Sequence, residues 1–176
     1  MKFTRLIALL LLLPTLALAE IRDPEKHFFD PKLGNFQEEL AEAKKQGKKA
    51  ILFFFEMDDC PWCARMKSTI MNQSEVQDLY RQHFLIFPID TNGDTAMTDF
   101  QGRETLEKTY ALENRVRATP TLLFFDLDGK LIVRHTGPTK DINEFMLLAR
   151  YVIDGDYKNK PFAIYKQANK PTPANP

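Results

Sequence analysis

The two cysteines of this chain, Cys60 and Cys63, stand three residues apart in the segment MDDCPWCARM. At the start of a helix, cysteines at this spacing lie on the same side of the first turn, within reach of a disulfide. Unpaired backbone N–H groups and the helix dipole would stabilise a thiolate on the first cysteine. Because the thiolate is the reacting form, we predict that Cys60 is the nucleophile and that Cys63, the more buried cysteine, resolves a mixed disulfide.

A metal site and a purely structural disulfide are the competing interpretations of this pair. A zinc site needs about four ligands, whereas His27, His83 and His135 are scattered and none belongs to a second ligand pair. A structural disulfide between neighbours three apart would close a very short loop, and short loops give the least stabilisation. A redox dithiol without metal or other cofactor is therefore the favoured interpretation.

A continuous apolar run, AILFFFE at residues 50–56, directly precedes the cysteine motif. Such a run predicts a strand that is buried on both faces. Pro61 suits the first turn of a helix, where its missing N–H would have no partner in any case. The sequence thus predicts a strand that ends before the motif and a helix that begins within it.

Further strands are expected in the second half of the chain. The segment FLIFPID at residues 84–90 predicts one strand, and residues 121–135 predict a hairpin with an Asp128-Gly129 turn. Between them, the polar residues 91–102 predict a surface loop.

Helices are expected to separate these strands. Capping boxes and apolar periodicity predict their starts: Asn35 with Glu38, Ser74 with Gln77, about Arg103 (ending near Leu112), and Asp141. The element order is then helix, strand, helix, strand, helix, hairpin, helix. This order indicates an α/β fold with a central mixed sheet and helices on both faces.

The N-terminus has the features of an export signal. Lys2 and Arg5 give it a positive start, residues 6–13 form a short apolar run, and ALA at residues 17–19 fits a cleavage site before Glu20. The run is too short to span a bilayer, which needs about 20 residues. We therefore expect cleavage, no stable membrane insertion afterwards, and a periplasmic location where disulfides persist.

Composition sets further bounds on partners and domains. The 24 basic and 24 acidic residues balance, which argues against nucleic acid as the main partner. Four segments are predicted: a signal peptide (1–19), an irregular N-terminal segment (20–34), a single folded domain (35–158) and a tail (159–176) that is loose at its end.

The sequence resembles the thioredoxin superfamily, and most strongly its exported SoxW-like group. The resemblance rests on CPWC after a strand, on ATPTLLFFDLDGK before the hairpin turn, and on the flanking segments LGNFQEELAEAKKQGKKAILFFFE and LLARYVIDGDYK. It covers about residues 34–158 and implies a thioredoxin fold. It also implies that the protein is a thiol–disulfide oxidoreductase acting on protein disulfides.

The resemblance implies roles for residues outside the cysteine pair. It implies that Pro120 has a cis peptide bond beside the cysteines and that Thr119 pairs with an extended substrate segment. Trp62 either contacts a substrate or packs on the domain's own surface. Thioredoxin has a buried aspartate where this chain has Phe54, so Glu56 is the candidate proton relay, unless it is simply a strand-end charge.

Charge near the motif bears on the direction of electron flow. Asp58 and Asp59 precede Cys60, and negative charge disfavours its thiolate, which favours a reductase. Arg65 and Lys67 offset this only in part, since such side chains usually point to solvent. The resemblance suggests a membrane thiol transporter of the DsbD type as electron donor.

We expect a monomer that acts mainly as a reductase. The alternatives are a disulfide oxidase or isomerase, although residues 20–34 look too short for an isomerase's dimerisation segment, and a redox-silent module that binds a partner through the same surface. Sulfur-oxidation carrier proteins and cytochrome c maturation factors both stay open as substrates.

Overall fold

A four-stranded mixed sheet forms the centre of the molecule. The computed structural model describes residues 20–169, so the expected signal peptide lies outside the described residues. The strand order is β2 (Phe84–Asp90), β1 (Ala50–Glu56), β5 (Thr121–Phe125) and β6 (Leu131–Thr136). Strand β1 runs parallel to β2 and antiparallel to β5, and β5 and β6 form the predicted hairpin. The predicted thioredoxin fold is therefore confirmed.

Strand β1 is buried on both faces, as its uninterrupted apolar sequence predicts. Leu52 and Phe54 contribute to one core, whereas Phe53 and Phe55 contribute to the other. All four side chains have 0% exposure. Because both faces are covered, the end of β1 is a rigid support for the cysteine motif that follows it.

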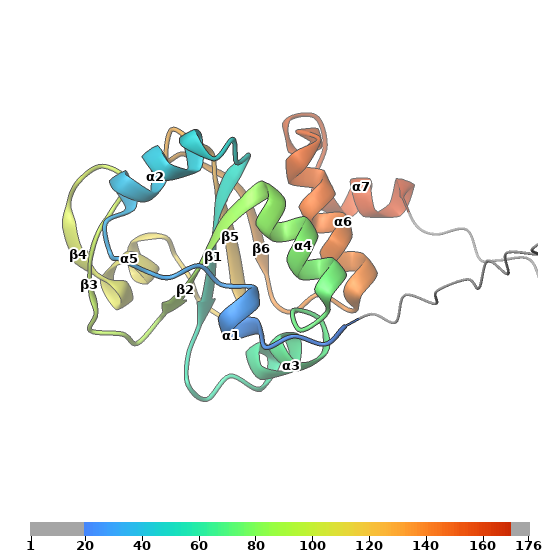
Figure 1. Ribbon diagram of the computed structural model, residues 1–176, viewed down its shortest axis with the longest axis horizontal. Coiled ribbons are helices and arrows are strands. Elements are labelled where there is room, and N and C mark those ends of the chain that lie inside the picture. Colours follow the sequence, from blue (N-terminus) through green and yellow to red (C-terminus); the bar gives the residue numbers. More distant parts are fainter. Residues whose placement is uncertain (1–19, 170–176) are drawn as a thin grey trace, which may run out of the picture.

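Helices cover both faces of the sheet (Figure 1). One core contains residues from α3, α4, α6 and α7 together with Phe28 and Phe29, which follow α1, and the other contains residues from α2, α5 and β3. The bounds are α1 (Pro24–His27), α2 (Phe36–Lys45), α3 (Pro61–Thr69), α4 (Ser74–His83), α5 (Glu107–Glu113), α6 (Ile142–Ile153), the short 3₁₀ helix η1 (Asp156–Lys158) and α7 (Phe162–Ala168). None of the helices within residues 20–169 is long and apolar enough to cross a membrane.

The predicted start of α2 is confirmed. The side chain of Asn35 accepts hydrogen bonds from the backbone N–H groups of Gln37 and Glu38, at 3.2 and 3.4 Å. The Asn35 side-chain amide in turn donates to the Glu38 carboxylate at 2.8 Å. The capping residues thus satisfy two N–H groups that a helix start leaves unpaired.

The predicted capping box at Ser74 is wrong. Ser74 is already the first residue of α4, and Gln73 precedes it without a side-chain cap. Gln77 is only 1% exposed. Its amide donates to the carbonyls of Met71 and Arg22, at 2.8 and 3.2 Å. A polar side chain that is buried needs such partners, and this requirement takes Gln77 away from the helix start.

The segment predicted as a surface loop and helix start also differs. Strand β3 (Ala96–Thr98) pairs antiparallel with β4 (Glu104–Leu106), so α5 begins at Glu107 rather than near Arg103. Met97 and Phe100 are buried in the α2-side core, at 4% and 7% exposure. These apolar residues hold the small hairpin against the domain.

The segments flanking the predicted domain contain structure of their own. Residues 20–34 include α1, and the part of the tail that the structure describes includes α7. Tyr165 of α7 is 5% exposed and its ring lies 5.2 Å from that of Tyr151 on α6. Lys166 forms an ion pair with Glu144 at 2.6 Å. Residues 162–168 therefore form a helix that packs against α6, and the end of the tail, which was predicted to be loose, lies outside the described residues.

Candidate active site

The cysteine pair lies at the junction of β1 and α3. Cys60 and Cys63 form a disulfide with their Cα atoms 5.2 Å apart. Pro61 is the first residue of α3, and Cys60 is its N-cap, with its sulfur accepting a hydrogen bond from the Cys63 N–H at 3.1 Å. The predicted geometry at the helix start is thus confirmed. It places the Cys60 sulfur where the helix N-terminus would stabilise negative charge.

The disulfide borders a cavity that also contains acidic groups. Cys60 is 6% exposed and Cys63 is 2% exposed. The cavity has a volume of about 260 Å³ and is lined by Glu56, Met57, Asp58, Cys60, Cys63, Ala64, Lys67 and Asp90. It is large enough for several water molecules, each of which occupies about 30 Å³ in the liquid. The cavity therefore places water-sized space beside both cysteines and these carboxylates.

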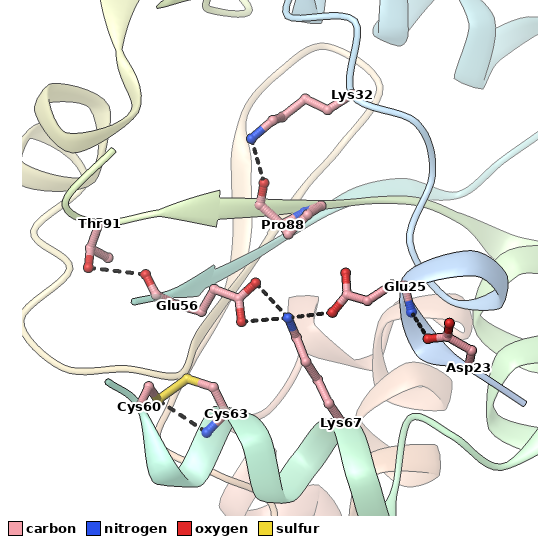
Figure 2. Close-up of polar contacts among 9 residues, drawn as sticks. All are labelled: Asp23, Glu25, Lys32, Glu56, Cys60, Cys63, Lys67, Pro88 and Thr91. Atoms are coloured by element: carbon pink, nitrogen blue, oxygen red, sulfur yellow. Dashed lines mark hydrogen bonds and ion pairs between the residues drawn. A yellow bond between two sulfur atoms is a disulfide. The ribbon is translucent and has the colours of Figure 1, made fainter. Parts of the chain in front are cut away.

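Glu56 is the carboxylate of this cavity that pairs with Lys67. It is the last residue of β1, and its side chain is 20% exposed. Both carboxylate oxygens lie 2.8 Å from the Lys67 ammonium, which also contacts the Glu25 carboxylate at 2.7 Å (Figure 2). Burial raises the pKa of Glu56 although the Lys67 charge acts to lower it. Glu56 thus retains a proton more readily than an exposed glutamate.

Lys67 does not point to solvent, contrary to the prediction. Its side chain is 21% exposed because it turns towards the end of β1. Burial acts to lower the pKa of Lys67, but the hydrogen bonds to Glu25 and Glu56 outweigh it and raise the pKa. The ammonium therefore stays charged. Arg65, by contrast, is exposed as expected, and its guanidinium donates to the carbonyl of Lys140 at 3.2 Å.

Trp62 and Pro120 lie at the same end of the sheet as the motif. Trp62 is 53% exposed, and the Arg65 guanidinium lies 5.6 Å from its ring centroid. The Thr119–Pro120 peptide is cis, as the resemblance implies. Because Thr121 pairs with Phe55, the next step along the two antiparallel strands places Pro120 level with Glu56.

The sequence interpretation missed Lys67 and Glu25 as parts of this site. Lys67 follows Cys63 by one helical turn, and this spacing alone puts both on one face of α3. Glu25 carries no local signal, because only the folded chain brings α1 to α3. Within the described residues 20–169, no group of three or more His, Cys, Asp and Glu side chains is arranged to hold a metal ion.

The mixed sheet and the disulfide at the start of α3 define a fold of the thioredoxin-like, disulfide oxidoreductase type. A sequence model of the thioredoxin-like domain matches residues 36–153, and the chain therefore belongs to this family. No curated protein sequence matches it significantly.

Solved structures with the same fold include the following three proteins. A thioredoxin-fold protein from Helicobacter pylori is 20% identical, with 69% of this chain and 84% of that chain covered and a TM-score of 0.58. The DsbH oxidoreductase is 19% identical, with 84% and 94% covered and a TM-score of 0.55. A putative disulphide-isomerase from Bacteroides thetaiotaomicron is 22% identical, with 68% and 88% covered and a TM-score of 0.53. At these identities the similarity shows the fold.

Proposed function

We propose that this protein is a thiol–disulfide reductase that acts on protein disulfides through Cys60 and Cys63. The observation that carries the proposal is the placement of the Cys60 sulfur at the N-terminus of α3, bonded to Cys63 and beside an open cavity. A purely structural disulfide requires neither a helix N-terminus nor a cavity with titratable groups. A reactive cysteine benefits from both, because the helix N-terminus stabilises its thiolate and the titratable groups can exchange protons with it.

The first step is attack on the substrate. In the reduced protein, the Cys60 thiolate attacks one sulfur of the substrate disulfide, and the bond between the two substrate sulfurs breaks. The second substrate sulfur leaves as a thiolate and takes a proton from water. The product is a mixed disulfide between Cys60 and the substrate.

The second step releases the substrate. Cys63 gives its proton through the cavity to the Glu56 carboxylate, and the resulting thiolate attacks the Cys60 sulfur. The mixed disulfide breaks, the substrate leaves as its second thiolate, and the Cys60–Cys63 disulfide forms. Two electrons have then passed from the protein to the substrate. Glu56 suits the task because its pKa, raised by burial, is closer to neutral than that of an exposed glutamate.

Trp62, Thr119 and Pro120 form the proposed docking surface for the substrate. The exposed indole of Trp62 offers apolar area next to the cysteines. Thr119, which is half-buried, precedes β5 and would pair with an extended substrate segment as an added strand.

Reduction is the favoured direction because Asp58 and Asp59 are exposed beside Cys60 and would disfavour its thiolate. A protein that reduces substrates must itself be reduced again. Its proposed donor, on the family resemblance, is a membrane thiol transporter of the DsbD type. Sulfur-oxidation carrier proteins and cytochrome c maturation factors are two candidate classes of substrate, other protein disulfides stay open, and the resemblance to SoxW-like proteins is in keeping with a monomer.

Insulin reduction in the presence of dithiothreitol tests the activity. The wild-type protein should accelerate precipitation of the insulin B chain, and the Cys60→Ser variant should match the rate with dithiothreitol alone. If the wild-type protein gave no acceleration, the domain would be a redox-silent binding module. Equilibration with glutathione then gives the potential, and a value nearer to strong oxidants than to thioredoxin would favour the oxidase alternative.

The proposed periplasmic location has its own test. Mass spectrometry of the protein from the periplasmic fraction should show Glu20 as its first residue. A chain that retains Met1 in the membrane fraction would contradict the proposal of cleavage and export.

A further inference from the structure

Lys67 is one cation held between two anions from different parts of the chain. Its ammonium contacts the carboxylates of Glu56 at 2.8 Å and of Glu25 at 2.7 Å. Glu56 ends β1 and borders the cavity beside the disulfide, whereas Glu25 belongs to α1 and is mostly exposed. Figure 2 shows the three side chains in a row, with Lys67 in the middle. The positive charge that stabilises ionised Glu56 is therefore shared with Glu25.

The N-terminal segment that carries Glu25 is fixed to the domain on both sides of α1. Before the helix, the Arg22 N–H donates to the carbonyl of Asn72 at 2.8 Å. After it, the Asp30 N–H donates to the carbonyl of Ile86 at 2.8 Å, and the Asp30 carboxylate accepts from the Ile86 N–H at 2.8 Å. These bonds hold Glu25 in position, so that its contact with Lys67 is set by the fold.

Phe29, from the same segment, contacts Lys67 independently. Its ring is 4% exposed, and the Lys67 ammonium lies 5.1 Å from the ring centroid. The aromatic face attracts the cation and covers one side of it. Glu25 and Phe29 together direct the lysine towards the end of β1, where it contacts Glu56.

Other charged groups near Glu56 share one sign. Asp90 at the end of β2 and Asp58 after β1 line the same cavity, and Asp90 and Glu25 both act to raise the pKa of Glu56, after the larger effect of burial. Lys67 is the cation that lines this cavity and acts in the opposite direction. How far Lys67 stabilises the ionised form of Glu56 therefore depends on how strongly Lys67 also interacts with Glu25.

We infer that Glu25 and Lys67 are positioning residues that set how readily Glu56 accepts the Cys63 proton, which makes the N-terminal segment part of the active site. This inference rests on the proposed function, because it concerns the step that resolves the mixed disulfide. Lys67 keeps Glu56 ionised and ready to accept a proton. Glu25 limits that stabilisation, so that the ionised carboxylate remains a strong enough base.

The test is a titration of the Glu56 carboxyl by ¹³C NMR in the oxidised protein, in which neither cysteine titrates. Glu25→Gln should lower the pKa of Glu56 by about half a unit, because Lys67 then pairs with Glu56 alone. Lys67→Met should raise it by about one unit or more, because Glu56 then faces only negative neighbours. Both variants disrupt the contact between Glu25 and Lys67. If this contact had only a structural role, both variants would shift the pKa of Glu56 in the same direction, so shifts in opposite directions support the inference.

Two matched variants complete the titration. Glu20→Gln removes the same charge from the same segment, but Glu20 pairs with Arg22 at 3.0 Å rather than with Lys67, so the pKa of Glu56 should not change. Lys67→Arg keeps the charge and should leave the pKa close to that of the wild-type protein. If Lys67→Met does not fold, the pair of Glu25→Gln and Glu20→Gln still decides the question.

Single-turnover resolution of a mixed disulfide with a fluorescent peptide supplies the second readout. The midpoint of its pH profile should move down in Glu25→Gln and up in Lys67→Met. An unchanged Glu56 pKa in Glu25→Gln, or shifts of the same sign in the two variants, would overturn the inference while leaving the proposed function intact. A wild-type protein that reduces no disulfide would instead overturn the proposed function, and the inference with it.

Discussion

Two lysine-paired carboxylates lie near the same end of the central sheet, yet they differ in what else they face. Glu56 pairs with Lys67, and its side chain remains 20% exposed on the cavity beside the disulfide. Glu107 pairs with Lys32, and its side chain is only 3% exposed. Both are connected to Asp90, which pairs with Glu56 across the strands and donates its N–H to Glu107 at 3.3 Å. Burial and a lysine partner are thus not enough to mark a functional carboxylate.

The surroundings of Glu107 are those of a structural ion pair. Lys32 also donates to the carbonyl of Pro88 at 3.1 Å (Figure 2), so that both charged groups have further hydrogen-bond partners. The pair ties the N-terminal segment to the start of α5 and to β2. Glu56, in contrast, borders the cavity that Cys60 and Cys63 also line. Access to a reacting atom distinguishes the two sites.

Replacing the lysine of each pair should give the largest difference between the two pairs, measured as the loss in free energy of unfolding. Lys32→Met leaves a buried, unpaired carboxylate and should lower the free energy of unfolding by about 3–5 kcal/mol. Lys67→Met should lower the free energy of unfolding by about 1 kcal/mol. The loss is smaller because water in the cavity can hydrate Glu56 and because the ion pairs of Lys67 are partly exposed. Urea denaturation of both variants measures the difference. Equal losses would show that the two carboxylates are equally enclosed.

Replacing the carboxylate should affect activity in the Lys67–Glu56 pair but not in the Lys32–Glu107 pair. Glu56→Gln cannot accept the Cys63 proton and should slow resolution of the mixed disulfide about 10- to 100-fold at neutral pH. Glu107→Gln should leave that rate close to the wild-type value in the fraction that folds. The assay is stopped-flow release of a peptide thiol.

The pH dependence of the same reaction should identify Glu56 as the group that accepts the proton. As pH falls through the pKa of Glu56, the carboxylate becomes protonated and can no longer accept a proton, so the rate should fall. Burial raises this pKa, so the fall should begin above the ordinary glutamate value of about 4.3. In Glu56→Gln this limb of the profile should be absent. A limb that persists unchanged would assign the titration to another group.

The exposed carboxylates beside the motif should have the smallest effect. Replacing both Asp58 and Asp59 with asparagine should lower the pKa of the Cys60 thiol by about 0.5 to 1 unit, because two partly screened charges are removed. The disulfide should become more oxidising, though by less than this shift if Cys60 is only partly ionised. Thiolate absorbance against pH and equilibration with glutathione measure the two effects. An unchanged or raised Cys60 pKa would remove the electrostatic argument for a reductase.

Local features of the site and fold were predictable because their causes lie close together in the sequence. The apolar run of β1, the cap at Asn35 and the placement of Cys60 and Cys63 at a helix start each depend on neighbouring residues. The Asp128-Gly129 turn is similar, since Gly129 adopts a φ of +74° that favours glycine.

Features that depend on distant contacts were not predictable in the same way. Gln77 has the spacing of a capping partner, but its burial against residues 22 and 71 decides its role. Lys67 has the sequence context of a surface residue, but Glu25 and Phe29 from another segment turn it inwards. Periodicity within a window of a few residues contains no information about such partners.

Trapping the mixed disulfide tests directly whether Cys60 is the thiol that attacks the substrate. Reduced Cys63→Ser is mixed with a disulfide-bonded peptide, and the products are analysed by mass spectrometry without reductant. We expect a stable adduct joined to Cys60, and none when Cys60→Ser is treated in the same way. An adduct on Cys63 in the Cys60→Ser protein, formed as fast as the one on Cys60, would contradict the assignment of Cys60 as the attacking thiol.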